Sequence, residues 1–388
     1  MTLSYCYGCR DYWWTCMLLV WTYAVVSRCS HLSHRSVTGD VLVEAAMSMS
    51  TIPTPRQAHA YEPPIWTRNV LENIPPNGRL HLANLPTPLY KLESFTTKKN
   101  GILQSLKDEY GISLFVKRDD MTGGVELGGN KLRKLEFLMA DALAKGYNAV
   151  VTIGGIQSNH CRATASVARM MGLEPHLILR TNSNNKSGKS TSSSSSSNTS
   201  KSKSNDDIGL TGNLLMDRMV GSHIYTCTPG EYGRIGSDAL VERLCSHLRQ
   251  QTTSNDDNNN EDNNECCKPY GIPVGGSNGI GSWGYVNAVE EVMGQWTAMR
   301  DSLGSFLSLD HVVFACGSGG TAAGIGLGMA LARPHKPHVH AMGVCDTPSY
   351  FEHHVSQIIT DMGLVLPSYL STQEFISQHM DFHQGKGL

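Results

Sequence analysis

The sequence predicts an α/β protein in which mostly parallel sheets are covered by helices on both faces. Short apolar runs typical of buried strands alternate with segments of helical periodicity along most of the chain. Two of the predicted strands end in glycine-rich turns that lead directly into a helix, an arrangement typical of ligand-binding α/β proteins. With 388 residues, 40% of them hydrophobic, the chain is long enough to form two domains with separate cores.

The individual elements follow from apolar runs of strand length and from the helical segments between them. Strands are expected at Ser113–Asp119, Asn148–Gly155, Pro175–Thr181, Ser222–Cys227 and His311–Gly320. Helices are expected at Lys131–Lys145, Asn159–Met171, Thr211–Val220, Gly236–Gln250, Gly284–Leu303 and Thr321–Ala332. Strands that alternate with helices in this way pair in parallel, so both faces of each sheet should be buried.

The composition narrows the class of function. The net charge of −2 and the absence of a basic patch interleaved with aromatic residues argue against a nucleic-acid partner. The eleven cysteines are scattered and no CxxC pair recurs at zinc spacing, so no metal site is expected and reduced, intracellular thiols are favoured.

Residues 1–60 differ from the rest of the chain and are interpreted as a leader that is either disordered or a targeting segment. The apolar run Tyr12–Val26 is shorter than the roughly 20 residues that a membrane span needs, so no membrane association is expected. A targeting leader would send the protein to mitochondria or another organelle, and otherwise the protein would be cytoplasmic. Alternatively, translation begins at Met47 or Met49.

Two stretches of biased composition interrupt the alternation of strands and helices. Residues 181–207 are rich in Ser, Asn and Lys, and residues 252–265 are rich in Asn, Asp and Glu. Neither stretch has enough apolar surface to offset the entropy lost on ordering, so both are predicted to be disordered insertions.

The segment Phe314–Gly328 runs from an apolar strand through a glycine turn into a helix of small residues. Glycines allow backbone N–H groups to converge, and a helix N-terminus adds positive potential, so the turn predicts a cradle for a phosphate. A tight turn packed closely on a neighbour is the structural alternative. The segment fits neither the P-loop nor the dinucleotide-binding pattern. The candidate phosphate ligands are Gly317, Ser318, Gly319, Gly320 and Thr321.

A second strand end carries four consecutive polar residues, Gln157, Ser158, Asn159 and His160, at the start of a helix. A Ser or Asn at this position is common as a helix cap. Four polar side chains exceed what a cap requires, however, and a substrate carboxylate would meet N–H donors, a hydroxyl and the helix dipole there.

Three cations, Lys131, Arg133 and Lys134, crowd the first turn of a predicted helix. Because a helix N-terminus disfavours positive charge, the lysine pKa values should be lowered. A neutral lysine can form a Schiff base with an aldehyde, and an anion nearby would hold the other cations in place. Together with the phosphate cradle, this favours pyridoxal 5′-phosphate as the cofactor. The structural alternative is a solvated basic helix face.

These motifs resemble those of the D-cysteine desulfhydrase and 1-aminocyclopropane-1-carboxylate (ACC) deaminase family of fold type II, tryptophan-synthase-β-like pyridoxal-phosphate enzymes. The resemblance covers about residues 62–388 and looks closest to the plant and algal branch. It is carried by LPTPLYKL, LFVKRDDMTG, ELGGNKLRKLEF, TIGGIQSNHCRATA, IPVGGSNGIGSWGY and ACGSGGTAAGIGLG, in that order.

The resemblance implies two open, twisted, mostly parallel sheets flanked by helices, with the active site between two domains. The large, cofactor-binding domain would comprise residues 61–133 and 269–388, and the small domain residues 134–268. A small amino acid would be the substrate, and the family generally forms homodimers.

The resemblance also implies roles for single residues. Lys131 matches the lysine that carries the cofactor and moves protons, with Asn130 beside it, and Lys134 matches a lysine that approaches the phosphate. Ser158 matches a nucleophile or carboxylate-positioning group, and Asn159 matches the asparagine at the ring hydroxyl. Gln157 and His160 would complete the substrate pocket, and Gly317 to Thr321 would hold the phosphate.

The implied reaction is α,β-elimination of D-cysteine to pyruvate, sulfide and ammonia, which His160 favours over ACC deamination, the alternative within the family. Family members continue beyond a segment like DFHQGKGL, so a chain that stops at Leu388 is expected to be shortened. A third possibility is therefore a catalytically impaired relic that binds the cofactor. A plain sugar- or nucleotide-binding domain is a fourth.

Overall fold

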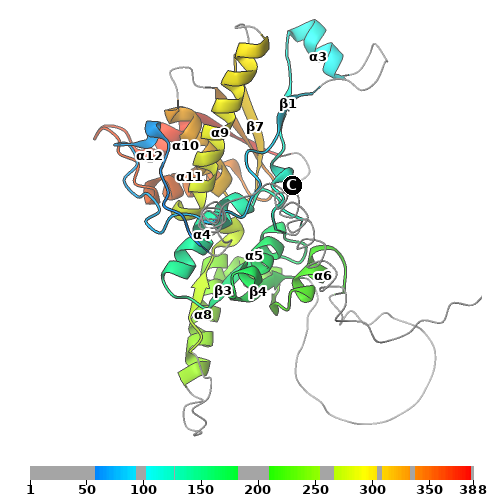
Figure 1. The fold of residues 1–388 in the computed structure, drawn as a ribbon, viewed down its shortest axis with the longest axis vertical. Helices are drawn as coiled ribbons and strands as arrows, with labels where there is room; N and C mark the ends of the chain where they lie inside the picture. Colours follow the sequence, from blue (N-terminus) through cyan, green and yellow to red (C-terminus); the bar gives the residue numbers. More distant parts are fainter. Residues whose placement is uncertain are drawn as a thin grey trace, which may run out of the picture. The chain divides into compact units, whose positions relative to one another are not determined.

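The protein is built on separate β-sheets, which Figure 1 shows in a computed structural model. The structure describes residues 57–92, 102–125, 127–181, 209–253, 266–303, 308–332 and 337–385. All of them belong to one compact unit, Pro55–Leu388. The predicted leader and the two predicted disordered insertions lie almost entirely outside these residues. Within the described part, no helix is long and apolar enough to cross a membrane.

The first parallel sheet has the strand order β5-β4-β3-β6. Its strands are β3 (Ala149–Gly155), β4 (Glu174–Arg180), β5 (His223–Cys227) and β6 (Pro269–Gly271). The two central strands are almost wholly buried because helices cover both faces of this sheet.

The second parallel sheet has the order β7-β8-β9. Its strands are β7 (His311–Cys316), β8 (His338–Gly343) and β9 (Met380–Gln384). A further pair, β1 (Leu89–Lys91) and β2 (Phe115–Lys117), is antiparallel. The strand predicted at residues 113–119 is therefore shorter than expected and belongs to neither parallel sheet.

Helices connect the strands. They are α3 (Ile102–Tyr110), α4 (Leu132–Ala144), α5 (Asn159–Met170), α6 (Gly212–Met219), α7 (Pro229–Ile235), α8 (Ser237–Thr253), α9 (Gly279–Leu303), α10 (Gly320–Leu331), α11 (Pro348–Asp361) and α12 (Thr372–Ser377). Short 3₁₀ turns lie at Ile65–Thr67, Asp119–Met121 and Val274–Gly276. The predicted helices are all present with ends shifted by a few residues, and the α/β class is confirmed.

The hydrophobic cores follow the sheets. One core joins α9, α10 and α11 to the inner face of β7-β8-β9. Another lies between α4 and α5. The two faces of the first sheet are covered separately, one by α8 and the other by α5 and α6. The division into two domains with the predicted boundaries stays a prediction.

Helix α9 fixes the position of α4, against which it packs. At Gly284 the two backbones lie close together, since a Cβ there would lie 2.2 Å from the Arg133 carbonyl oxygen and 2.9 Å from the Lys134 amide nitrogen. Only a residue without a side chain allows backbones to come this close. The first turn of α4, with its cations, is thus seated on the backbone of α9.

Candidate active site

Lys131 lies immediately before α4, at the N-cap position, and provides no side-chain cap. The turn that leads to it uses Gly128 (φ 65°) and Gly129 (φ 107°), in the left-handed region that glycine adopts readily. The Thr122 hydroxyl accepts from the Gly129 amide at 2.7 Å and donates to its carbonyl at 2.9 Å. The Tyr285 hydroxyl donates to the Asn130 carbonyl at 3.2 Å. The backbone on the N-terminal side of Lys131 is therefore held from two directions.

The pKa of Lys131 is lowered from its usual value of 10.5, as the sequence predicts. The main cause is burial of the amine. The sequence predicts the same direction, but from the position of Lys131 at a helix N-terminus. The neighbouring Cys316 thiol opposes the shift only partly. Because burial disfavours the charged form, a larger fraction of Lys131 carries the neutral amine that a Schiff base requires.

Lys134 is more deeply buried than Lys131, with 1% of its surface exposed. Its Nζ donates to the Gly275 carbonyl and to Ser277 Oγ, both at 3.1 Å. Burial, and then the charge of Lys131, hold the pKa of Lys134 well below its usual value. The two amines therefore lie close enough for their charges to interact, on one side of α4.

Arg133 serves a different purpose from the two lysines. Its guanidinium, 1% exposed, donates to Asp119 at 2.8 and 3.0 Å and to Glu291 at 3.0 Å twice. Burial works to lower the pKa of Arg133, but the hydrogen bonds and charges of Glu291 and Asp119 outweigh it and raise the pKa. The expectation that a ligand anion would hold all the remaining cations is thus wrong for Arg133, because two carboxylates of the chain already do so.

The predicted phosphate loop meets Lys134 through the hydroxyl of Ser277. Ser277 Oγ donates to Ser318 Oγ at 2.9 Å and accepts from the Gly320 amide at 3.1 Å. Gly319, with φ 80°, is the N-cap of α10. At Gly320 a Cβ would lie 2.8 Å from Lys134 Nζ. The turn, the amine and the Ser277 hydroxyl thus form one connected group.

This group fits a phosphate monoester. It combines a lysine amine, two serine hydroxyls and the N-terminus of a twelve-residue helix, which are the donors that phosphate sites use. The loop is open to solvent beside them, because Gly317 is exposed and Ser318 and Thr321 are half-buried. The glycine cradle therefore has both the chemistry and the access that an anionic ligand needs.

Among the polar residues after β3, Ser158 caps a helix, whereas Gln157 and Asn159 contact the start of another helix. Ser158 is the N-cap of α5, and its Oγ accepts from the Cys161 amide at 3.2 Å. Gln157 and Asn159 are exposed and contact Asn213 at the start of α6. Asn213 Nδ2 donates to the Gln157 carbonyl at 2.7 Å and to Asn159 Oδ1 at 2.9 Å, and its backbone amide donates to Gln157 Oε1 at 2.9 Å. Asn213 thus contacts two of the four residues that are predicted to bind substrate, Gln157 and Asn159.

His160 lies beneath this strand end and is 4% exposed. Its Nε2 is 2.9 Å from Thr152 Oγ1. Burial, followed by the charges of Lys131 and Lys134, holds the pKa of His160 well below its usual value. His160 is thus a neutral neighbour of both amines, which ties the end of β3 to the start of α4.

Three residues of the site were not predicted from the sequence. Ser277 lies in a glycine-rich turn after β6, whose VGGSNG pattern was a usable signal. Tyr285 lies six residues into α9, and burial raises the pKa of its phenol, so the hydroxyl stays protonated and can donate. Asn213 lies at the start of α6, shortly after residues 182–208, which lie outside the described part of the chain.

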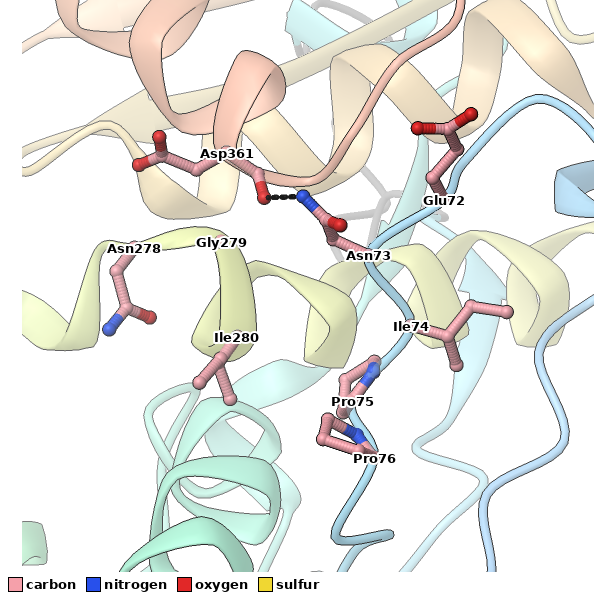
Figure 2. Close-up of a pocket in the computed structure, with 9 residues that line it drawn as sticks. All are labelled: Glu72, Asn73, Ile74, Pro75, Pro76, Asn278, Gly279, Ile280 and Asp361. Carbon is pink, nitrogen blue, oxygen red and sulfur yellow. Dashed lines mark hydrogen bonds between the residues drawn. The ribbon is translucent and has the colours of Figure 1, made fainter.

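Two hollows lie near these elements. One, of about 540 Å³, is lined by Ile156, Arg180, Thr181 and Pro229 at the carboxyl ends of β3 and β4, next to Gln157 and Ser158. The other, of about 390 Å³, lies between the segment Glu72–Pro76, the start of α9 and the end of α11. Figure 2 shows it, with Asn73 Nδ2 donating to the Asp361 carbonyl. None of the predicted site residues lines either hollow, but the first hollow includes Ile156, which directly precedes the predicted substrate residues along the chain.

Comparison with known proteins identifies the family. Residues 80–373 match the family described as pyridoxal-phosphate dependent enzyme. The chain belongs to that family. Pyridoxal phosphate is accordingly its cofactor, as the sequence predicts.

Similar proteins agree with this assignment. The mitochondrial bifunctional D-cysteine desulfhydrase/1-aminocyclopropane-1-carboxylate deaminase of Arabidopsis thaliana is 40% identical over 312 residues, which are 79% of this chain and 65% of that protein. A relative from Thermotoga maritima is 35% identical over 310 residues, 80% of this chain and 79% of its own length. A crystal structure described as that of an ACC deaminase homologue covers 82% of this chain and 75% of its own, with a TM-score of 0.52 and 25% identity. The fold type II architecture is thereby confirmed, and the chain spans about two thirds of the Arabidopsis protein.

Proposed function

We propose that this chain is a pyridoxal-phosphate-dependent lyase that eliminates sulfide from D-cysteine, with Lys131 as the residue that carries the cofactor. The observation that carries the proposal is the lowered pKa of a buried amine, Lys131, next to a connected phosphate-type donor group. The 40% identity to a protein named for D-cysteine desulfhydrase and ACC deaminase activity supports the choice of reaction.

Lys131 has two tasks in this proposal. Its neutral amine would hold the cofactor at the aldehyde, and the same amine would serve as the base for the α-proton of the substrate. When bound, pyridoxal phosphate supplies an electron sink for the negative charge left at the α-carbon. The low pKa matters for both tasks because an ammonium can neither attack an aldehyde nor accept a proton.

The remaining residues position the reactants. Ser277, Ser318 and the N-terminus of α10 would hold the phosphate, together with the amine of Lys134 that contacts Ser277. The α5 N-terminus, with Ser158 at its cap, receives the substrate carboxylate, and Asn213 keeps Gln157 and Asn159 in place around it. Asn159 is assigned to the ring hydroxyl of the cofactor.

The overall reaction is balanced by hydrolysis. Loss of the α-proton and of the β-sulfur as sulfide leaves a carbon–carbon double bond, and the resulting enamine takes up water to give pyruvate and ammonia. ACC deamination is the second candidate, because the Arabidopsis protein is named for both activities and the similar crystal structure is that of an ACC deaminase homologue. We also propose that the chain forms a homodimer, as the resemblance implies.

Product analysis separates these functions. Purified chain loaded with pyridoxal phosphate is incubated with D-cysteine, L-cysteine or ACC, and sulfide and 2-oxobutyrate are measured. Sulfide from D-cysteine alone supports the proposal, whereas 2-oxobutyrate from ACC alone replaces it with the second candidate. Cofactor absorbance without any product identifies a binding relic. Borohydride reduction and peptide mapping should locate the cofactor label on Lys131, and a label on another lysine would overturn the assignment.

A further inference from the structure

A group of metal-binding side chains lies at the amino-terminal edge of the first sheet, away from the cofactor loops. His176 on β4 and His223 on β5 are direct partners in the parallel register. Their imidazole rings are stacked, with centroids 4.5 Å apart and planes inclined by 13°. Glu174 lies two residues before His176 on the same strand and therefore on the same face of the sheet. One ligand atom from each of the three residues lies within 4.8 Å of the others.

The two ring nitrogens of His176 differ in their surroundings. Its ring is 5% exposed, its Nδ1 is 3.2 Å from the Tyr225 hydroxyl, and its Nε2 is a buried nitrogen without a hydrogen-bond partner. Buried polar atoms are normally paired, so an unpartnered ring nitrogen needs an explanation. In metal sites a histidine typically binds the ion through one nitrogen while the other makes a hydrogen bond that fixes the ring.

The other two side chains supply access and negative charge. His223 and Glu174 are about half-exposed, and His223 Nε2 is 3.2 Å from Glu174 Oε2. The second carboxylate oxygen, Oε1, is 3.6 Å from the guanidinium of Arg169, which itself donates to the carbonyls of Val220 and Gly221. One carboxylate oxygen therefore faces the two imidazoles, and a solvated ion can approach from the exposed side.

We propose that Glu174, His176 and His223 bind a divalent transition-metal ion, of which Zn²⁺ is the first choice. Two imidazole nitrogens and one carboxylate oxygen are a common zinc ligand set, with a fourth position left for water. Mg²⁺ and Ca²⁺ prefer oxygen ligands and are disfavoured here.

The position of the group indicates what a bound ion would do. Glu174 and His223 are the first residues of β4 and β5, whereas the cofactor residues follow the carboxyl ends of β3 and β7. An ion here would join the edge strand β5 to its neighbour β4. The proposed site is therefore structural, and its occupancy should change the melting temperature without changing the absorbance of the cofactor.

A second histidine group competes for metal ions and must be removed in the test. His338, His340 and Asp381 are close enough to share an ion. Both ring nitrogens of His340 are already engaged, at 3.0 Å from His311 and 3.0 Å from His383. His176 has a ring nitrogen without a partner and His340 has none, which favours the first group as the metal site.

Calorimetric titration of the cofactor-loaded, chelator-treated chain with zinc chloride tests the proposal in a His338→Gln/His340→Gln background. The background protein should bind one Zn²⁺ per chain and melt at a higher temperature with the metal. Glu174→Gln and His223→Gln, which alter half-exposed side chains and leave the core intact, should each weaken binding at least about tenfold. Tyr225→Phe, which removes only the partner of His176 Nδ1, should weaken binding about tenfold.

His353→Gln is the matched control, since His353 is an exposed histidine on α11, outside both groups. It should leave the zinc affinity unchanged. The proposal is overturned if the background protein takes up no zinc in a saturable way. It is also overturned if Glu174→Gln and His223→Gln bind zinc as tightly as the background protein does. Neither result depends on whether the enzyme acts on D-cysteine.

Discussion

The amine of Lys134 lies 3.1 Å from the hydroxyl of Ser277, and that hydroxyl also reaches Ser318 and the amide of Gly320. A helix, a turn after β6 and the predicted phosphate loop, which are distant in sequence, thus meet at one oxygen atom. Ser277 therefore connects the predicted phosphate loop to Lys134, in the first turn of α4.

Replacing Ser277 by alanine should weaken cofactor binding. The change leaves the buried amine of Lys134 with a single partner and removes one of the two acceptors of the Gly320 amide, the other being the Ser318 carbonyl. Lost hydrogen bonds to charged groups cost about 1.5–3 kcal/mol. We expect the dissociation constant for pyridoxal phosphate to rise about tenfold or more in a fluorescence titration. Ser246→Ala, at a half-buried serine on α8 outside the site, is the control and should not change it.

Substituting Gly320 by alanine should also impair the cofactor site. The new methyl group would lie 2.8 Å from Lys134 Nζ and 2.8 Å from the Cα of Ser277, so one of the two must move. We expect cofactor affinity to fall at least about tenfold. Gly294→Ala on α9, where a Cβ meets nothing within 4 Å, should leave affinity unchanged and stabilise the protein by about 0.5–1 kcal/mol.

Arg133→Met should be strongly destabilising. It leaves the carboxylates of Asp119 and Glu291 without their buried cation, and breaking a buried ion pair costs about 3–5 kcal/mol. Urea unfolding should show the loss of stability. The matched change is Arg118→Gln, whose partner Asp120 is 63% exposed, and it should shift the unfolding midpoint little. Equal shifts in the two variants would contradict the structural role assigned to Arg133.

The rate at which the cofactor attaches should depend on pH in a direction set by Lys131. Only the neutral amine attacks the aldehyde, and its fraction rises as pH rises through the pKa. Because burial lowers the pKa of Lys131 from 10.5, the attachment rate should reach half of its maximum below pH 10.5. Stopped-flow absorbance at a series of pH values measures it, with free lysine as the reference. A midpoint at or above that of free lysine would show that burial does not activate the amine.

Asn213→Ala should impair substrate binding while the cofactor stays bound. Without its side-chain amide, the Gln157 carbonyl and Asn159 Oδ1 lose a shared donor at the mouth of the strand end. We expect KM for the amino-acid substrate to rise about tenfold, with a smaller change in the cofactor dissociation constant. Asn148→Ala, which removes an asparagine that also joins two segments but at the opposite edge of the sheet, should leave KM unchanged.

The sequence predicted best those elements whose signal is local. Strands β3 and β7 are apolar runs ending in glycine, and the helices after them begin with recognisable residues. Strand β8 was missed because its HVHAMG pattern alternates polar and apolar residues, with histidines on the face that the core does not cover. Strand β9 alternates in the same way, and β6 is only three residues long.

The residues of the candidate site also differ in whether a local sequence signal marks them. Lys131, Ser158 and the glycine loop could be singled out because each lies in a run of unusual composition. The partners of Arg133 could not, because Glu291 is 158 residues away along the chain and only tertiary packing brings it there. Likewise, nothing local indicates that burial, more than the helix start, lowers the pKa of Lys131.

The contact between Gly284 and the carbonyl of Arg133 limits how this enzyme can be re-engineered. Because α9 meets the backbone of α4 directly, any side chain larger than hydrogen at position 284 would displace the first turn of α4. The displacement would also move the amine of Lys131, which lies two residues before Arg133. Libraries that seek a new substrate range should therefore vary the loops around the carboxyl ends of the strands and keep this interhelical glycine fixed.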